Sequence, residues 1–164
     1  MASVETRGDP IRWLRALLER ERDPARLRRL VLDAALELLA AERGYLVRRR
    51  ASGELEVEVA LGFDADELRG PAGQISRTAV ERVLERSRGL VTASEEDWEV
   101  GDATSLRQSR VTCVACVPVR GGGEVWGVLY LDHRFDPAAF VPEDLEPLQA
   151  LADLAGERLV ALEE

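Results

Sequence analysis

Two strongly apolar runs joined by a glycine-rich turn constrain this chain more than any other stretch. They extend from Cys113 to Asp132, on either side of the four residues from Arg120 to Gly123. Glycine supplies the positive φ angles that a tight reversal needs, so the pattern predicts a β-hairpin. Neither run alternates between apolar and polar residues, which indicates strands covered on both faces at the centre of a sheet. Pro118 lacks an N–H donor, so the first strand must bulge or reach an edge there.

Amphipathic patterns predict helices at both ends of the chain. Apolar residues recur at spacings of three and four in residues 11–21, in residues 24–41 and again in residues 142–163. The second helix begins with Asp23 and Pro24, an N-cap followed by a residue whose missing N–H costs nothing in the first turn. The apolar stripe of this helix is broader than one sheet contact needs.

A second hairpin is expected between the first helices and the middle of the chain. Its strands are residues 44–50 and 55–61, and the latter alternates apolar residues with Glu56, Glu58 and Ala60. Such alternation leaves one face wet and places the strand near a sheet edge. The three consecutive arginines at 48–50 are interpreted as a solvated cluster that protects an edge.

A further helix and an irregular segment separate the two hairpins. Hydroxyl groups of Ser76 or Thr78 are expected to cap a helix that ends near Arg86, before a short strand at residues 90–92. Residues 93–112 are acidic and lack periodicity. A long irregular segment inside a compact domain is typical of a functional lid, here with a short helix near its Thr104.

Composition indicates a single soluble domain. The 164 residues are 46% hydrophobic and 32% charged, and no apolar run approaches the roughly 18 to 20 residues of a membrane span. No signal-peptide pattern begins the sequence, so we expect a cytoplasmic location. A net charge of −9 argues against a nucleic-acid partner, because phosphate contacts need clustered positive charge. We expect a flexible segment at residues 1–9 and one domain over residues 10–164.

The order of these signals resembles the GAF family of small-molecule-sensing domains. The resemblance is carried by CVPV at residues 116–119, the glycine turn, and GVLYLD at residues 127–132. It is closest to the GAF domains that precede the ATPase of bacterial σ54-dependent transcription activators. The implied fold is α+β and PAS-related, with a central antiparallel sheet of about six strands over residues 43–132. N- and C-terminal helices, at 10–41 and 142–163, would cover one face, and a ligand pocket beneath the lid the other.

The resemblance also implies a function and a set of site residues. Such domains are sensory rather than enzymatic, form homodimers through their first and last helices, and pass a signal to an effector such as a σ54 activator or a kinase. Where those activators show Arg-Ser before the central strand, this chain has Thr112-Cys113. Side chains that flank the lid and match ligand-contacting positions are Phe63, Ser76, Asp102, Ser105 and Arg107.

Cys113 and Cys116 form a CxxC pattern, which is typical of zinc and redox sites, but the rest of the sequence does not support either. A zinc site needs about four ligands, and the sequence has no second CxxC and only one histidine. Residues three apart on a strand point to opposite faces, so a disulfide would require a broken strand. We therefore interpret both as small buried strand residues. The thiol-dependent alternative is the related family of free methionine sulfoxide reductases, whose reactive cysteines lie in loops that contain none here.

Two other hypotheses remain open from the sequence. Cyclic-nucleotide-binding GAF domains carry a motif of which this chain keeps only Phe140 and Asp144, so cyclic nucleotide is a weakly supported ligand. The alternative to a sensor is a dimerisation or protein-interaction module whose pocket is filled by its own side chains, for which Phe63, Trp98 and Tyr130 are candidates.

Overall fold

The computed structural model describes residues 10–63, 71–92, 113–134 and 139–163. The expected flexible segment at 1–9 and the expected lid, with its helix near Thr104, lie outside these residues.

Five strands form one antiparallel sheet in the described part of the chain, where about six were expected. Their order across the sheet is β2-β1-β5-β4-β3, so β5 is the middle strand. The hairpin of β4 and β5 is buried almost throughout, which confirms its predicted central place. The strands are β1 (Arg43–Arg49), β2 (Leu55–Leu61), β3 (Leu90–Thr92), β4 (Cys113–Gly121) and β5 (Glu124–His133).

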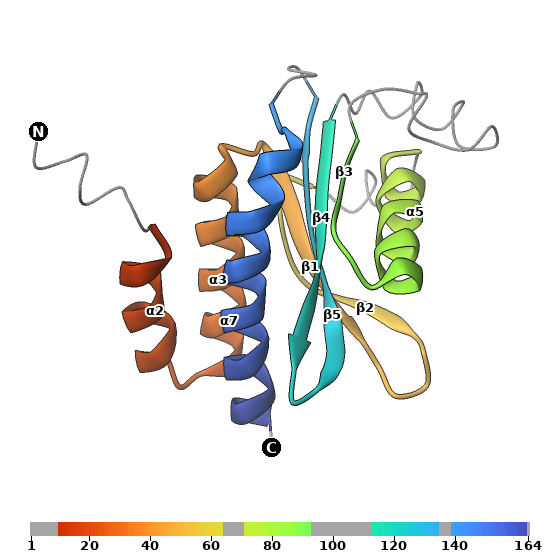
Figure 1. Ribbon diagram of the computed structural model, residues 1–164. Coiled ribbons are helices and arrows are strands. Elements are labelled where there is room, and N and C mark those ends of the chain that lie inside the picture. Colours follow the sequence, from red (N-terminus) through yellow and green to blue (C-terminus); the bar gives the residue numbers. More distant parts are fainter. Residues whose placement is uncertain (1–9, 64–70, 93–112, 135–138, 164) are drawn as a thin grey trace, which may run out of the picture.

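Helices cover the two faces of this sheet unequally (Figure 1). The helices α3 (Pro24–Leu39) and α7 (Leu145–Glu163) pack on one face, with α2 (Pro10–Arg20) outside them. On the other face lies α5 (Pro71–Arg86), and a short 3-10 turn, η2 (Pro142–Asp144), precedes α7. This α+β arrangement is the predicted one. No helix in these described ranges is long and apolar enough to cross a membrane.

The start of α5 differs from the sequence-based expectation. The helix begins at Pro71, so Ser76 and Thr78 lie inside it and neither is its N-cap. Proline fits the first helical turn because its absent N–H has no intrahelical acceptor there and its fixed φ suits the helix. The expected cap of α3 is confirmed, since Asp23 Oδ1 accepts a hydrogen bond from the N–H of Ala25 at 3.1 Å.

Each sheet face builds its own apolar core. Cys113 belongs to the core under α3 and α7, whereas Cys116 belongs to the core under α5. The two thiols are therefore buried on opposite faces, as their spacing predicts, and they are not joined. Burial raises the pKa of Cys116 well above its ordinary value because the thiolate would be desolvated.

Pro118 lies where β4 has an open outer edge. β3 pairs with β4 only as far as Cys116, so no described strand lies beside the proline on that side. The carbonyl of Pro118 instead accepts a hydrogen bond from Gln149 of α7 at 2.9 Å. The predicted edge position is confirmed.

A bulge in β2 changes which side chains of that strand face the core. Val59 lies opposite Leu46 and Val57 opposite Val47, so Glu58 is the extra residue. Successive residues of β1 face opposite sides of the sheet, and Val57 is thereby turned away from the face that Val59 occupies. The simple alternation expected from the sequence is wrong for this reason, and Val57 is left 44% exposed.

The interpretation of the three arginines as edge protection is also wrong. β2 is indeed an edge strand, but the arginines end β1, which lies between β2 and β5. Arg48 forms an ion pair with Glu163 of α7, and Arg50 forms one with Glu56 of β2. Arg49 and Arg50 are exposed, as a solvated cluster predicts, whereas Arg48 joins β1 to α7.

Two glycines let α7 cross the end of β4 at backbone contact. A Cβ built on Gly156 would lie 1.9 Å from the carbonyl oxygen of Arg120, and one on Gly121 would lie 2.3 Å from the carbonyl oxygen of Gly156. Neither position has room for a methyl group. The atoms in the way belong to the backbone, so the helix or the strand would have to shift.

We expect Gly156→Ala to lower the free energy of unfolding by about 1–3 kcal/mol, because the added methyl group overpacks the crossing. Chemical denaturation of both proteins measures this difference. In an open helix the same change stabilises by up to about 1 kcal/mol, so a stabilised variant would contradict the tight crossing.

Candidate ligand site

A buried ion pair lies on the α5 side of the sheet. Arg43 donates from Nε to Asp132 Oδ1 at 2.7 Å and from Nη2 to Oδ2 at 2.9 Å. Tyr130 adds a hydrogen bond from its hydroxyl to Oδ2 at 2.8 Å. The side chains of the ion pair are 1% and 0% exposed. A buried charge pair of this kind is tolerated only when its hydrogen-bonding groups are satisfied.

Strand register brings these residues together. Arg43 at the start of β1 is the cross-strand partner of Asp132 near the end of β5, and Tyr45 is the partner of Tyr130. Residues two apart on a strand share a face, so both pairs lie on the side covered by α5. Tyr45 and Tyr130 belong to the core of that side.

Aromatic rings surround the ion pair. The guanidinium carbon of Arg43 lies 4.3 Å from the centroid of the Phe63 ring. The rings of Tyr45 and Tyr130 are 5.0 Å apart, and Phe63 meets Tyr45 edge-on at 6.0 Å. Gly62 places Phe63 here: its φ of +84° disfavours any other residue, and a Cβ at this position would lie 2.8 Å from Cγ of Arg43.

Burial shifts the acid–base properties of the cluster. Desolvation raises the pKa of Asp132 above its ordinary value, although the hydrogen bonds and charge of Arg43 and the Tyr130 hydroxyl act in the opposite direction. Burial, with the nearby Asp132 charge, also raises the pKa of Tyr130 well above its ordinary value. Tyr130 therefore stays protonated and remains a hydrogen-bond donor over the physiological range.

Of the predicted site residues, the structure places Phe63 in this cluster. Ser76 lies on α5 in the same layer, and its side chain is not among the described atoms. The other three, Asp102, Ser105 and Arg107, lie outside the described residues, as does Trp98.

The sequence reasoning missed Arg43, Tyr45 and Asp132. A signal was present, because Arg43 and Asp132 are the charged residues that border two apolar strands. Periodicity cannot show that these two residues become cross-strand partners, since the pairing of β1 with β5 joins segments almost ninety residues apart.

The rings of the cluster differ in exposure. Tyr45 and Tyr130 are buried, whereas Phe63 is half-buried and offers an apolar ring of the kind that stacks on planar ligands. The two residues kept from the cyclic-nucleotide motif do not lie in this cluster. Phe140 packs in the core under α3 and α7. Asp144 accepts a hydrogen bond from the N–H of Val141 at 2.9 Å. Among the described residues no group of His, Cys, Asp or Glu could hold a metal ion.

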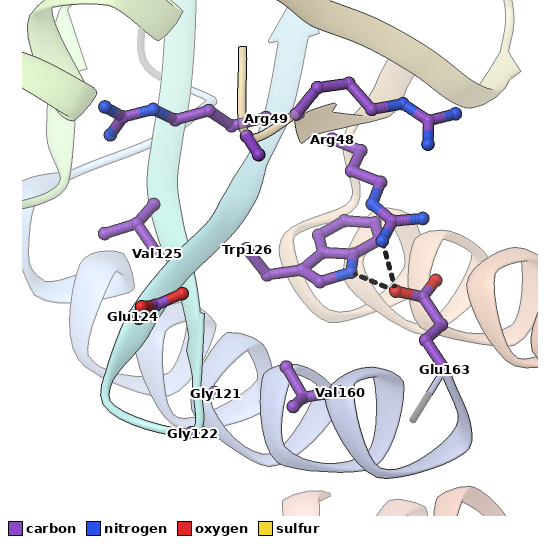
Figure 2. Close-up of a pocket in the computed structure, with 11 residues that line it drawn as sticks. Arg48, Arg49, Gly121, Gly122, Glu124, Val125, Trp126, Val160 and Glu163 are labelled. Carbon is purple, nitrogen blue, oxygen red and sulfur yellow. Dashed lines mark hydrogen bonds and ion pairs between the residues drawn. The ribbon is translucent and has the colours of Figure 1, made fainter. Parts of the chain in front are cut away.

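A concave region lies at the end of the sheet opposite this cluster. This groove of about 920 Å³ is bordered by the arginines at 48–50, the β4–β5 turn and the last turns of α7. Figure 2 shows Arg48 and Trp126 directed toward Glu163, whereas Arg49 points away from them. Arg48 and Arg49 therefore do not direct their charges to one point in this groove.

We expect Asp132→Asn to lower the free energy of unfolding by about 3–5 kcal/mol, because Arg43 would be left buried without its counter-ion. Chemical denaturation tests this. The double variant Arg43→Met with Asp132→Leu removes both charges and should cost less than the single change. A single variant within about 1 kcal/mol of the parent would contradict a buried pair.

The raised pKa of Tyr130 predicts a loss of stability in alkali. Below a pH of about 10, tyrosine is protonated in both states and the advantage of the folded state is complete. As pH rises above that value, the unfolded chain releases this proton first, so stability falls through the raised folded pKa.

Denaturation curves of the parent and Tyr130→Phe between pH 8 and 11.5, a range chosen around the ordinary tyrosine pKa of about 10, isolate this effect. The sequence contains no lysine, which simplifies the comparison. If the free energy of unfolding fell with the same slope in both proteins above pH 10, Tyr130 would ionise as freely in the folded state as in the unfolded one.

Comparison with known proteins places this geometry in a family. The model of the GAF domain matches residues 23–159. No curated protein sequence matches the chain. Among solved structures, residues 122 to 287 of a methyl-accepting chemotaxis protein align with a TM-score of 0.68 at 16% identity, covering 91% of this chain and 96% of that one.

Two further solved structures share the fold. The GAF domain of a sensor histidine kinase from Pseudomonas syringae pv. tomato gives a TM-score of 0.64 at 19% identity, covering 98% of this chain and 91% of that one. A protein with bound biliverdin, in its far-red absorbing dark state, gives 0.67 at 14% identity, covering 95% of this chain and 100% of that one. With the family model matching most of its length, the chain belongs to the GAF domain family.

Proposed function

We propose that this chain is a sensory domain in bacterial signal transduction, which binds a small molecule and passes the signal through its helices to an effector. The observation that supports this most is the polar and aromatic cluster of Arg43, Asp132, Tyr130, Tyr45 and Phe63 on the sheet face opposite α3 and α7. Solved structures of the same fold are described as parts of a chemotaxis protein and of sensor histidine kinases.

The helical layer offers a route for the signal. α7 packs against β4, α3 and α2. Arg158 of α7 also donates to the carbonyls of Leu18 at 3.2 Å and Glu21 at 3.1 Å, at the C-terminal end of α2. Cationic groups stabilise such an end because its carbonyls are unpaired and the helix dipole is negative there. A displacement of α7 is therefore passed to α2.

The remaining parts of the proposal follow from the resemblance. The domain works in the cytoplasm as a homodimer through its first and last helices, where Leu17 of α2 is 39% exposed. Its effector is a σ54-dependent activator or a signalling kinase, and ligand binding shifts a population between two helix arrangements. The domain is not itself an enzyme.

One observation favours the alternative of a ligand-free interaction module. Phe63, Tyr45 and Tyr130 contact one another and pack over Arg43, as a pocket filled by its own side chains would require. A sensor and a filled module differ in whether a small molecule stabilises the folded state.

We expect a bound small molecule to raise the melting temperature of the purified protein. At a hundred times Kd the stabilisation is about 2.7 kcal/mol. Native mass spectrometry reads stoichiometry and any co-purifying mass, and thermal shifts with biliverdin and cyclic GMP test two planar probes.

Phe63→Ala should reduce the rise in melting temperature that a bound probe causes, because it removes the ring that lies over Arg43. The control is Leu55→Ala, an exposed apolar residue at the other end of β2 and outside the proposed dimer helices. A dimer of bare chain mass that no probe stabilises would favour the interaction module.

A further inference from the structure

The last turn of α7 is fixed by a single carboxylate with donors from three other elements. Glu163 Oε2 accepts from Trp126 Nε1 of β5 at 2.9 Å and lies 3.0 Å from Arg48 Nη2 of β1. Its Oε1 accepts from Arg28 Nη1 of α3 at 3.3 Å. Figure 2 shows the first two contacts meeting at one oxygen.

Within the helix alone, the last turn of α7 is an unfavourable place for the acidic side chain of Glu163. The C-terminal end of a helix carries partial negative charge, so a carboxylate in the last turn is repelled. The side chain of Glu163 is nevertheless only 15% exposed, and those of Arg28 and Arg48 are 19% and 29% exposed. Contacts outside the helix therefore hold Glu163, and they dock the end of α7 on the sheet.

The strands that hold Glu163 are also the strands that carry the candidate ligand site. β1 has Arg43 near one end and Arg48 near the other, and β5 has Asp132 and Trp126 in the reverse order. The two strands are paired without a break from Arg43 with Asp132 to Arg48 with Gly127. One two-stranded ladder thus joins the buried ion pair to the end of α7.

We propose that Glu163 is a positioning residue that couples the last turn of α7 to the Arg43–Asp132–Tyr130 network through β1 and β5. The inference rests on the proposed sensory function, whose signal this connection carries. A change in the ion pair or its aromatic cover shifts the two strands together, and Arg48 and Trp126 move with them. Coupling of this kind is reciprocal, so loss of the Glu163 contacts also loosens the network.

The test is a double-mutant cycle of Tyr130→Phe and Glu163→Gln in the full chain, read by amide hydrogen exchange. Both changes keep the shape of the side chain. Tyr130→Phe removes the hydrogen bond to Asp132, and Glu163→Gln removes the negative charge that pairs with Arg28 and Arg48. Tyr130 lies four residues along β5 from Trp126, the partner of Glu163, which is roughly 13 Å of extended strand. At such a distance independent effects on stability add. Exchange is followed in the last turn of α7 and in residues 43–45.

We expect Glu163→Gln to speed exchange in residues 43–45 at least threefold, and Tyr130→Phe to do the same in the last turn of α7. The double variant should depart at least threefold from the product of the single effects. The matched control is Glu157→Gln, an exposed acid on the same helix, whose effect should multiply with that of Tyr130→Phe. Trp126→Phe removes a second donor to Glu163 and should reproduce the Glu163→Gln result.

The coupling would be overturned if each single change altered exchange rates only near its own site. It would also be overturned if the rates of the double variant lay within twofold of the product of the single effects. The cycle uses no ligand, so its outcome is separate from that of the thermal-shift experiment. Coupling without ligand binding would refute the sensor and keep the connection, whereas ligand binding without coupling would keep the sensor and refute the role of Glu163.

Discussion

The bidentate pair of Arg43 and Asp132 sets the relation of β1 to the central strand. Two charges without solvent contact are stable only in a geometry that satisfies both, so the pair selects one register of β1 on β5. A slip by one residue would leave a buried charge unpaired and would turn the apolar side chains of β1 to the wrong face. The hydroxyl of Tyr130 completes the shell of Asp132, which links the aromatic cluster to the same requirement.

The helices cover the two faces of the sheet unequally, and the two faces bury different kinds of residues. On one side three helices bury a continuous apolar core, and the described part of the other side has α5 alone over a mixture of aromatic and ionic groups. The helical side supplies most of the apolar burial that stabilises the fold. The α5 side can therefore carry polar groups, which is the usual division between a stabilising core and a binding face.

Much of the fold could be predicted from local patterns. The unbroken apolar runs of β4 and β5, the Asp23 cap and the opposite facing of Cys113 and Cys116 follow from short-range rules. The bulge at Glu58, the start of α5 at Pro71 and the internal place of Arg48 depend on contacts between distant segments. The site follows the same division: Phe63 was found by resemblance, whereas Arg43 and Asp132 become partners only when β1 pairs with β5.

The crossing of Gly121 and Gly156 is the point at which α7 lies closest to the sheet. Backbone meets backbone there, so the helix is held closely at one point while side chains separate it from the sheet elsewhere. About 16 Å of helix precede Gly156 and about 10 Å follow it, at 1.5 Å per residue. The crossing therefore divides α7 into a longer and a shorter arm. Gln149 on the longer side is hydrogen-bonded to Pro118 at the open edge of β4, and Glu163 on the shorter side contacts β1 and β5, so the two arms are anchored to different strands of the sheet.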